Sequence, residues 1–196
     1  MATAANGSKL QALHTLDISH NQLGPSFILL VRQLRESCDF LTNLICAGNP
    51  GIKQTQQMQI PKSKKVSESP CMLLRLDLSG CLRGDEQIAQ LAQSSYLKDL
   101  KWLNLRKCKF GNDGLNELFS SKNLRSLEVL IVRDNKVQLV EGPFSDLESA
   151  SEKQIKKGIM KLQLLDIRGN KLTKIFLKEA VTFLKDTVVL MWDNPF

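Results

Sequence analysis

Cysteine and histidine are the side chains that most often do chemistry, and in this chain their spacing argues against it. The five cysteines form no CxxC pair and show no metal-ligand spacing with His14 or His20. The GxGxxG, GxxxxGK(S/T) and HExxH motifs of nucleotide, phosphate and zinc sites do not occur in the sequence. We therefore expect no catalytic residues, no enzyme activity, no metal and no cofactor.

Arg106, Arg133 and Arg168 share a sequence context, because each stands at the same place in a repeated pattern. In LEVLIVRDNKV, residues 127–137, apolar residues occupy the first, fourth, sixth and eleventh places, and Asn135 occupies the ninth. This pattern is typical of a leucine-rich repeat, in which a short strand leads into a turn whose Asn side chain bonds to the backbone of adjacent coils. The three arginines occupy the seventh place.

The pattern recurs along the chain in seven copies. Residues 41–49 form a weaker copy, and the last copy lacks the first Leu. The copies begin at Leu13, Leu41, Leu73, Leu100, Leu127, Leu162 and Asp186. Their ninth places hold Asn21, Asn49, Cys81, Cys108, Asn135, Asn170 and Asn194. Seven matches in phase predict seven parallel strands in a stack of repeats.

The commonest step between ninth places is about 27–28 residues, which leaves room for a helix between successive strands. Apolar residues at helical spacing indicate such helices near residues 27–34, 88–92, 115–119 and 176–184. Asp85 and Asn112, near the starts of the second and third of these helices, can each cap the first turn.

The long period, the helical return leg and the Cys or Asn at the ninth place (Cys81, Cys108, Asn135) resemble the ribonuclease-inhibitor-like class of leucine-rich-repeat proteins. The resemblance covers residues 10–196. It implies an α/β fold, a curved solenoid of about seven repeats with parallel strands on the concave face and helices on the convex face. It also implies a protein-binding scaffold, since members of the class serve mainly in that role and some regulate GTPases or nucleotide-dependent receptors.

Two steps in the register are too long, and we interpret the excess as inserts within the repeat domain. Residues 53–70 form a basic insert that we expect to be flexible, and residues 148–158 form a polar insert. The lysines at 62–65 read either as a solvated linker or as a nuclear-localisation or anion-contact segment, and Ser69-Pro70 could be a phosphorylation site. Residues 1–9 form a polar N-terminal tail.

Composition limits the cellular locations and the kinds of partner that we expect for this chain. The longest apolar runs fall far short of a membrane span, and the N-terminal residues lack the organisation of a secretory signal, so we expect no membrane contact. An odd number of cysteines fits a reducing compartment, which favours the cytoplasm, with the nucleus as the alternative. The net charge of +7 favours acidic partners but does not by itself indicate nucleic acid.

Side chains at the third, fifth and seventh places should point to the concave face, because strand residues alternate sides. The N-terminal half of this face is small and polar apart from Ile45 and Arg75, whereas the C-terminal half combines arginines with apolar residues. Aromatic and arginine side chains dominate binding energy at interfaces. We predict a partner-binding site at Trp102, Asn104, Arg106, Val129, Ile131, Arg133, Leu164, Asp166, Arg168, Leu190 and Trp192.

Structural roles compete with these interpretations. The arginines could be solvated strand residues, and Trp192 could cover an exposed end of the solenoid. His14 and His20, at the second and eighth places of one repeat, read as exposed polar residues rather than as a general base. Cys81 and Cys108 read as buried turn cysteines, which are usually inert.

The function we predict is a non-enzymatic protein–protein interaction module that binds an acidic and apolar partner surface through the C-terminal half of its concave face. We expect no small-molecule substrate. The alternatives are a regulator or adaptor of an enzyme, of the GTPase-activating or ubiquitin-ligase substrate-receptor type, or an anion- or nucleic-acid-binding scaffold. Nucleic acid is disfavoured because the chain lacks a strongly basic balance. Association through the uncapped solenoid ends is a further expectation.

Overall fold

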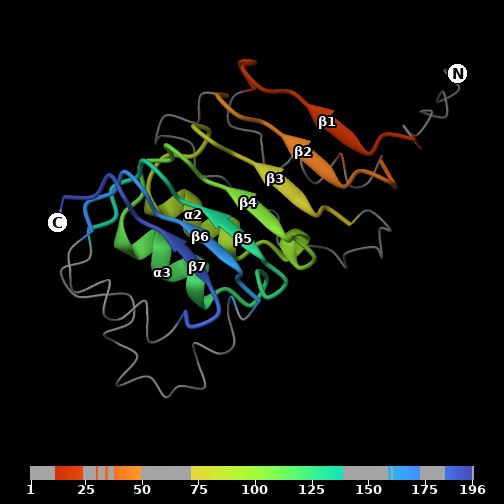
Figure 1. Ribbon diagram of the computed structural model, residues 1–196. Helices are drawn as coiled ribbons and strands as arrows, with labels where there is room; N and C mark the ends of the chain where they lie inside the picture. The colour runs from red at the N-terminus through yellow and green to blue at the C-terminus, as the bar shows by residue number, and fades with distance from the viewer. Residues whose placement is uncertain are drawn as a thin grey trace, which may run out of the picture.

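Seven short strands form one parallel sheet whose spatial order follows the sequence (Figure 1). The computed structural model describes residues 12–23, 38–49, 72–138, 161–172 and 184–195, together with the single positions 30, 34 and 159. The strands are β1 (Thr15–Asp17), β2 (Asn43–Ile45), β3 (Arg75–Asp77), β4 (Trp102–Asn104), β5 (Val129–Ile131), β6 (Leu164–Asp166) and β7 (Val188–Leu190). All seven predicted strands are therefore confirmed, and the fold is a leucine-rich-repeat solenoid of about seven repeats.

The register of the sheet aligns the repeats place by place. Leu103 at the fourth place of its repeat pairs with Leu76 on one side and Leu130 on the other, and all three are fully buried. The side chains at the third and fifth places flank this buried row and are partly or fully exposed, with Asp166 as the exception. The predicted alternation of strand side chains is confirmed.

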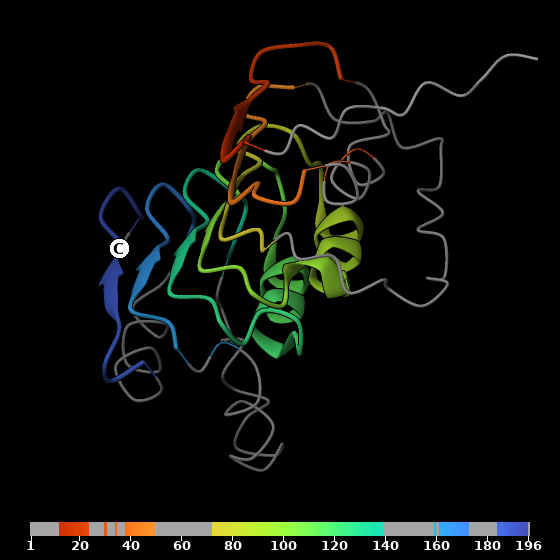
Figure 2. The same cartoon turned by 90° about the vertical axis from the view of Figure 1, so that its right-hand side faces the viewer.

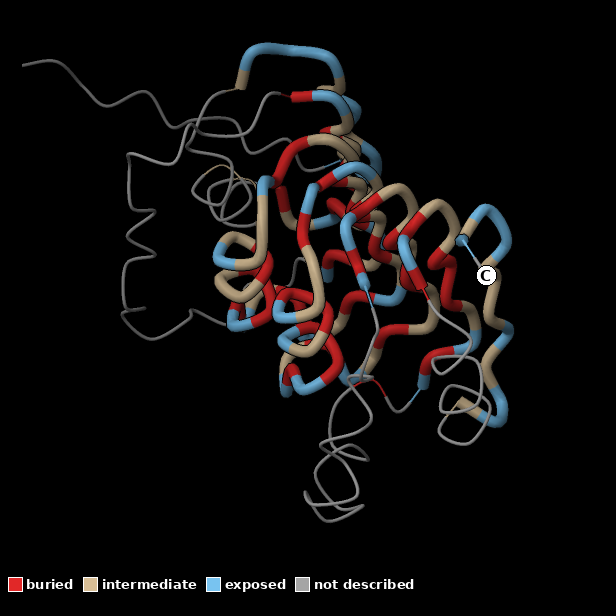
Figure 3. Tube along the Cα trace, turned by 90° about the vertical axis from the view of Figure 1, so that its left-hand side faces the viewer, coloured by how far each residue is buried: buried red, intermediate tan, exposed pale blue. Residues whose placement is uncertain are grey.

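The described return legs contain two α-helices and one short 3-10 helix, on the side of the sheet opposite the concave face (Figure 2). They are α2 (Asp85–Ala92), η1 (Ser95–Leu97) and α3 (Asn112–Ser120). The inward residues of α2 and α3 are those that the helical spacing predicted, including Ile88, Leu91, Leu115 and Leu118. Buried positions on strands and helices form one main core, and Cys38 and Leu41 form a small second cluster (Figure 3).

Several predictions fall outside the described residues. These are the polar tail at 1–9, the basic insert at 53–70 and the polar insert at 148–158. The expected helices at 27–34 and 176–184 also lie outside, apart from the positions 30, 34 and 184.

The expectation that Asp85 and Asn112 cap their own helices is wrong. Neither α2 nor α3 has a side-chain cap within its own first turn. Instead, Asp85 Oδ1 accepts hydrogen bonds from the backbone N–H groups of Gly111 and Gly114, both at 2.8 Å, at the start of the next helix. The first turn of α3 exposes backbone donors, and the preceding repeat supplies the carboxylate. Asn112 likewise bonds to the backbone of Gln138, one repeat further on.

The ninth-place side chains join adjacent coils, as the repeat pattern predicts. Asn170 Nδ2 donates to the carbonyl oxygen of Val132 in the preceding repeat at 3.0 Å and to that of Ile167 in its own repeat at 2.9 Å. Cys108 does the same with a single thiol, which lies 3.3 Å from the carbonyl oxygen of Leu78. These contacts satisfy carbonyl groups that would otherwise be buried without a partner.

The eighth place of every repeat has a left-handed backbone conformation, with φ between 55° and 71°. Three repeats place glycine there, the residue that adopts this conformation without a steric cost. The seven residues are His20, Gly48, Gly80, Lys107, Asp134, Gly169 and Asp193. In the other four repeats a side chain is kept at a position that favours glycine.

The described residues contain no helix that is both long and apolar enough to cross a lipid bilayer.

Candidate functional site

The predicted site residues lie together on the concave face of β4–β7, and we call this surface the C-terminal patch. Cross-strand pairing aligns Trp102 with Val129 and Leu164, and aligns Asn104 with Ile131, Asp166 and Leu190. Arg106, Arg133, Arg168 and Trp192 follow at the seventh places. Trp192 is 53% exposed, most of the others are partly exposed, and only Asp166 is buried. Residues up to about 90 positions apart in sequence thus share one surface.

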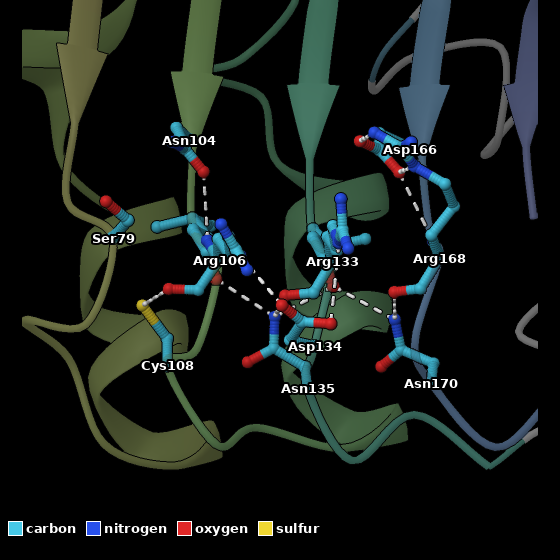
Figure 4. Close-up of polar contacts among 12 residues, drawn as sticks. Ser79, Asn104, Arg106, Cys108, Arg133, Asp134, Asn135, Asp166, Arg168 and Asn170 are labelled. Atoms are coloured by element: carbon cyan, nitrogen blue, oxygen red, sulfur yellow. Dashed lines mark hydrogen bonds and ion pairs between the residues drawn. The ribbon is translucent and has the colours of Figure 1, made fainter. Parts of the chain in front are cut away.

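Arg106 and Arg133 share one carboxylate, that of Asp134 (Figure 4). Arg106 Nε lies 2.7 Å from Asp134 Oδ2, and Arg133 Nε lies 3.5 Å from Asp134 Oδ1. Burial opposes the charge on Asp134, but the hydrogen bond from Arg106 and the charges of both arginines outweigh it, so the pKa of Asp134 is lowered. Two cations against one carboxylate leave an excess positive charge at this point.

Arg168 is held differently, in a two-point ion pair with Asp166. Its Nε and Nη2 donate to the two oxygens of Asp166 at 2.7 Å and 2.6 Å. The hydrogen bond to Asp166 raises the pKa of Arg168, and the nearby charges of Asp193 and Asp134 act in the same direction. The Arg168 side chain is 21% exposed, half the 41% of Arg106. Arg168 is therefore a balanced, fixed cation.

Two arginines stack on the tryptophans of the patch. The guanidinium carbon of Arg75 lies 3.8 Å from the ring centroid of Trp102, and that of Arg168 lies 4.6 Å from the ring centroid of Trp192. Such stacking holds each guanidinium group against its ring. Arg75 on β3 was not among the predicted site residues. Its pairing with Trp102 follows from their common third place in adjacent repeats, which was the available signal.

Asn104 and Asp166 have structural roles within the patch. Asn104 Oδ1 accepts the backbone N–H of Arg106 at 3.0 Å, and Asp166 Oδ1 accepts that of Arg168 at 3.3 Å. Asp17 and Asp77 bond to Ser19 and Ser79 in the same way outside the patch. Asn104 also donates to Asp77 Oδ2 at 3.0 Å. A fifth-place Asn or Asp therefore stabilises the turn wherever it occurs.

The remaining members of the patch are apolar. Val129, Ile131, Leu164 and Leu190 are partly exposed on adjacent strands. Val188, which was not predicted, continues this surface and is 59% exposed. Its third-place position on β7 could have identified it. Large aliphatic side chains that remain exposed beside fixed arginines are a combination found at interaction surfaces.

The histidines lie in the first repeat, away from the patch, and the described cysteines are buried. The ring of His14 stacks on Phe40 at a centroid distance of 5.9 Å, and both residues are exposed. Cys81 and Cys108 are buried, as predicted, and burial raises the pKa of the Cys108 thiol to about 12. A thiol with such a pKa is protonated at neutral pH and is a poor nucleophile. The described residues contain no group of His, Cys, Asp and Glu side chains that could hold a metal ion.

The family model described as "Leucine Rich repeat" matches residues 9–26. The solved structure of internalin C2 from Listeria monocytogenes is similar with 18% sequence identity and a TM-score of 0.48, over 92% of this chain and 72% of that chain. No curated protein sequence matches the chain.

Proposed function

We propose that this chain, a leucine-rich-repeat solenoid, is a non-enzymatic interaction module that binds a protein partner through the C-terminal patch. The repeat supports a protein-interaction role in general, and the residue types in the patch support the proposal that this surface carries it. A surface whose backbone is fixed in the sheet loses little conformational entropy when it binds.

The observation that carries the proposal is the coexistence of exposed apolar side chains and fixed arginines on β4–β7. Ile131 and Leu164 lie on the same face as Arg133 and Arg168, and Trp192 remains more than half exposed. The arginines are positioned by Asp134 and Asp166 before any partner arrives. Positioned arginines and exposed aromatic rings are the side chains that most often contribute strongly to binding.

The first test uses Ile131→Asp and Arg133→Glu. Each is immobilised as the full chain, and the proteins captured from a cell extract are quantified against wild type by mass spectrometry. Captured candidates are then purified, and their Kd values are measured by surface plasmon resonance. We expect each variant to weaken binding by at least about tenfold, because a buried carboxylate at either position would lack a partner charge.

The matched control is Ser95→Asp, which adds one negative charge at an exposed position on the return leg before β4. Urea denaturation of all three variants shows whether the fold is retained. If Ile131→Asp and Arg133→Glu bind purified partners as tightly as wild type and Ser95→Asp do, the C-terminal patch is not the binding surface.

We also propose a cytoplasmic location, with the nucleus as the alternative. Cys38, Cys46, Cys81 and Cys108 are free thiols in the described part of the chain, which suits a reducing compartment. Imaging of the tagged full chain tests this, and a secreted product would contradict it.

A further inference from the structure

Three lysines occupy the tenth places of repeats four to six, directly beside the C-terminal patch. Lys109, Lys136 and Lys171 are all exposed. Among the described residues, none of the three forms an ion pair with a carboxylate. Each of these lysines follows an arginine of the seventh place by three residues. The combination is absent from repeats one to three, where the tenth places hold Gln22, Pro50 and Leu82.

The backbone holds these lysines in register along the solenoid. The N–H of Lys136 donates to the carbonyl oxygen of Phe110 in the preceding coil at 2.8 Å, and that of Lys171 donates to Val137 at 2.9 Å. Adjacent coils are about 5 Å apart in the hydrogen-bonding direction of the sheet. The three lysines therefore stand on consecutive coils, just beyond the ends of β4, β5 and β6, and Lys109 differs from the other two in its left-handed backbone, with a φ of 60°.

The positive charge is concentrated beyond these strand ends. Arg168 has the carboxylate of Asp166 to itself, whereas Arg106 and Arg133 share Asp134 and the three lysines have no described partner. We call these five cations, Arg106, Arg133, Lys109, Lys136 and Lys171, the basic ledge. Cations that outnumber the neighbouring carboxylates attract an anionic chain and guide its encounter with the surface.

We propose that the basic ledge binds an acidic segment of the protein partner, whose carboxylates follow the ledge while its apolar side chains contact Val129 and Ile131. This inference rests on the proposed function and names the chemistry of the partner. A protein segment fits better than a nucleic acid because the neighbouring contact surface, which includes the partly exposed Val129 and Ile131, is aliphatic and suits apolar side chains rather than sugars and phosphates.

The test measures fluorescence anisotropy of two labelled probes, a hexaglutamate peptide and a single-stranded thymidine hexanucleotide, with the full-length chain at low salt. The ledge variant carries Lys109→Ala, Lys136→Ala and Lys171→Ala. The control carries Lys98→Ala, Lys122→Ala and Lys161→Ala, which removes the same charge from exposed positions away from the ledge. We expect wild type and control to bind hexaglutamate alike and the ledge variant to bind about tenfold more weakly, since three exposed ion pairs are lost.

Equal affinity of the ledge and control variants for hexaglutamate would overturn the proposal, as would the absence of saturable peptide binding to wild type. If the hexanucleotide binds more tightly than hexaglutamate, and this binding is lost in the ledge variant, the ligand of the ledge is a nucleic acid and not an acidic protein segment. Partner capture distinguishes a failure of the ledge proposal from a failure of the proposed function. If the ledge variant retains the proteins that Ile131→Asp loses, the ledge proposal fails and the proposed function stands. If Ile131→Asp retains them too, the proposed function fails.

Discussion

In the N-terminal repeats, the polar side chains of the concave face bond mainly to one another. Asn43 Nδ2 donates to Thr15 Oγ1 at 3.0 Å, and the Ser79 hydroxyl donates to Asp77 at 2.7 Å. On β4–β7, by contrast, cations outnumber the carboxylates near Arg106 and Arg133, and aliphatic side chains stay partly exposed. The backbone register is the same in both halves. The difference therefore lies in the side chains alone. The polar side chains of the N-terminal half bond to one another, whereas the C-terminal half has an excess of cations and partly exposed aliphatic side chains.

The largest expected effect is a loss of folding stability, and it tests whether the hydrophobic core is packed alike beneath the two halves of the concave face. Leu130→Ala removes a fully buried side chain from the middle of the sheet, whereas Leu16→Ala acts on a partly buried residue of β1. We expect Leu130→Ala to lower the free energy of unfolding by about 3 kcal/mol and Leu16→Ala by about 1 kcal/mol, because cavity formation scales with burial. Urea denaturation measures both values. Equal losses would show that the two halves are packed alike.

The second-largest expected effect is the loss of stability when a glycine at the eighth place of its repeat is replaced by alanine. For Gly80→Ala the only cost is the left-handed backbone conformation, since the atom nearest to an added Cβ is 3.8 Å away. Gly169→Ala has the same backbone conflict and also overlaps Asp134 Oδ1. We expect losses of about 1 kcal/mol and about 2–3 kcal/mol, respectively. Thermal denaturation of both variants tests this order, and a reversed order would mean that Asp134 moves aside freely.

A smaller effect of opposite sign is expected at Lys107, whose φ of 56° places a long side chain in the same column. Lys107→Gly should raise the free energy of unfolding by up to about 1 kcal/mol, because glycine adopts this conformation without the clash of a Cβ. The comparison is Gly80→Ala, which makes the reverse change one repeat earlier. Destabilisation of Lys107→Gly in urea would indicate that the lysine side chain makes a contact worth more than the strain.

The smallest effect distinguishes two carboxylates by the cause of their lowered pKa values. Hydrogen bonds from Ser19 lower the pKa of Asp17, whereas at Asp134 arginine contacts overcome the effect of burial. Salt screens charges more than short hydrogen bonds. In NMR titrations, raising NaCl from about 0.05 M to 0.5 M should move the pKa of Asp134 up toward 3.8 and leave that of Asp17 nearly unchanged.

The lowered pKa of Asp134 also gives a direction for acid stability. Because the folded pKa lies below the unfolded value of 3.8, the stabilisation is present above that pH and is lost as pH falls through the folded pKa. Asp134→Asn should therefore lose less stability than wild type on acidification to about pH 2. An identical loss would mean that the arginines do not stabilise this carboxylate.

The sequence predicted the strand rows because period and alternation are properties of the backbone. Every third-, fifth- and seventh-place assignment on β1–β7 depends only on counting from the repeat start, and the pairing of Trp102 with Val129 agrees with it. The two helices were predictable for the same reason, since Ile88 and Leu91 keep the helical spacing.

Contacts between repeats were not predictable in this way. Arg106 reaches Asp134, 28 residues ahead, rather than a carboxylate of its own repeat, and Asp85 bonds to the next helix. Such choices depend on side-chain reach and on the competition among neighbours, which a one-dimensional pattern does not encode. The lysines at the tenth places could have been read from the repeat register. The alternation rule does not assign them to the concave face, because the tenth place lies beyond the strand.

The bond from Asp85 to the start of α3 bears on whether repeats of this chain can be treated as interchangeable modules. Asp85 Oδ1 serves two backbone N–H groups of the following repeat, and Gly114 has no room for a Cβ against that oxygen. A fourth repeat that is transplanted by itself would therefore lose the Asp85 carboxylate of the third repeat, which accepts hydrogen bonds at the start of α3. The natural unit for repeat engineering in this protein is the block of repeats three to five, because Asp85 joins the third repeat to the fourth and Asn112 joins the fourth to the fifth.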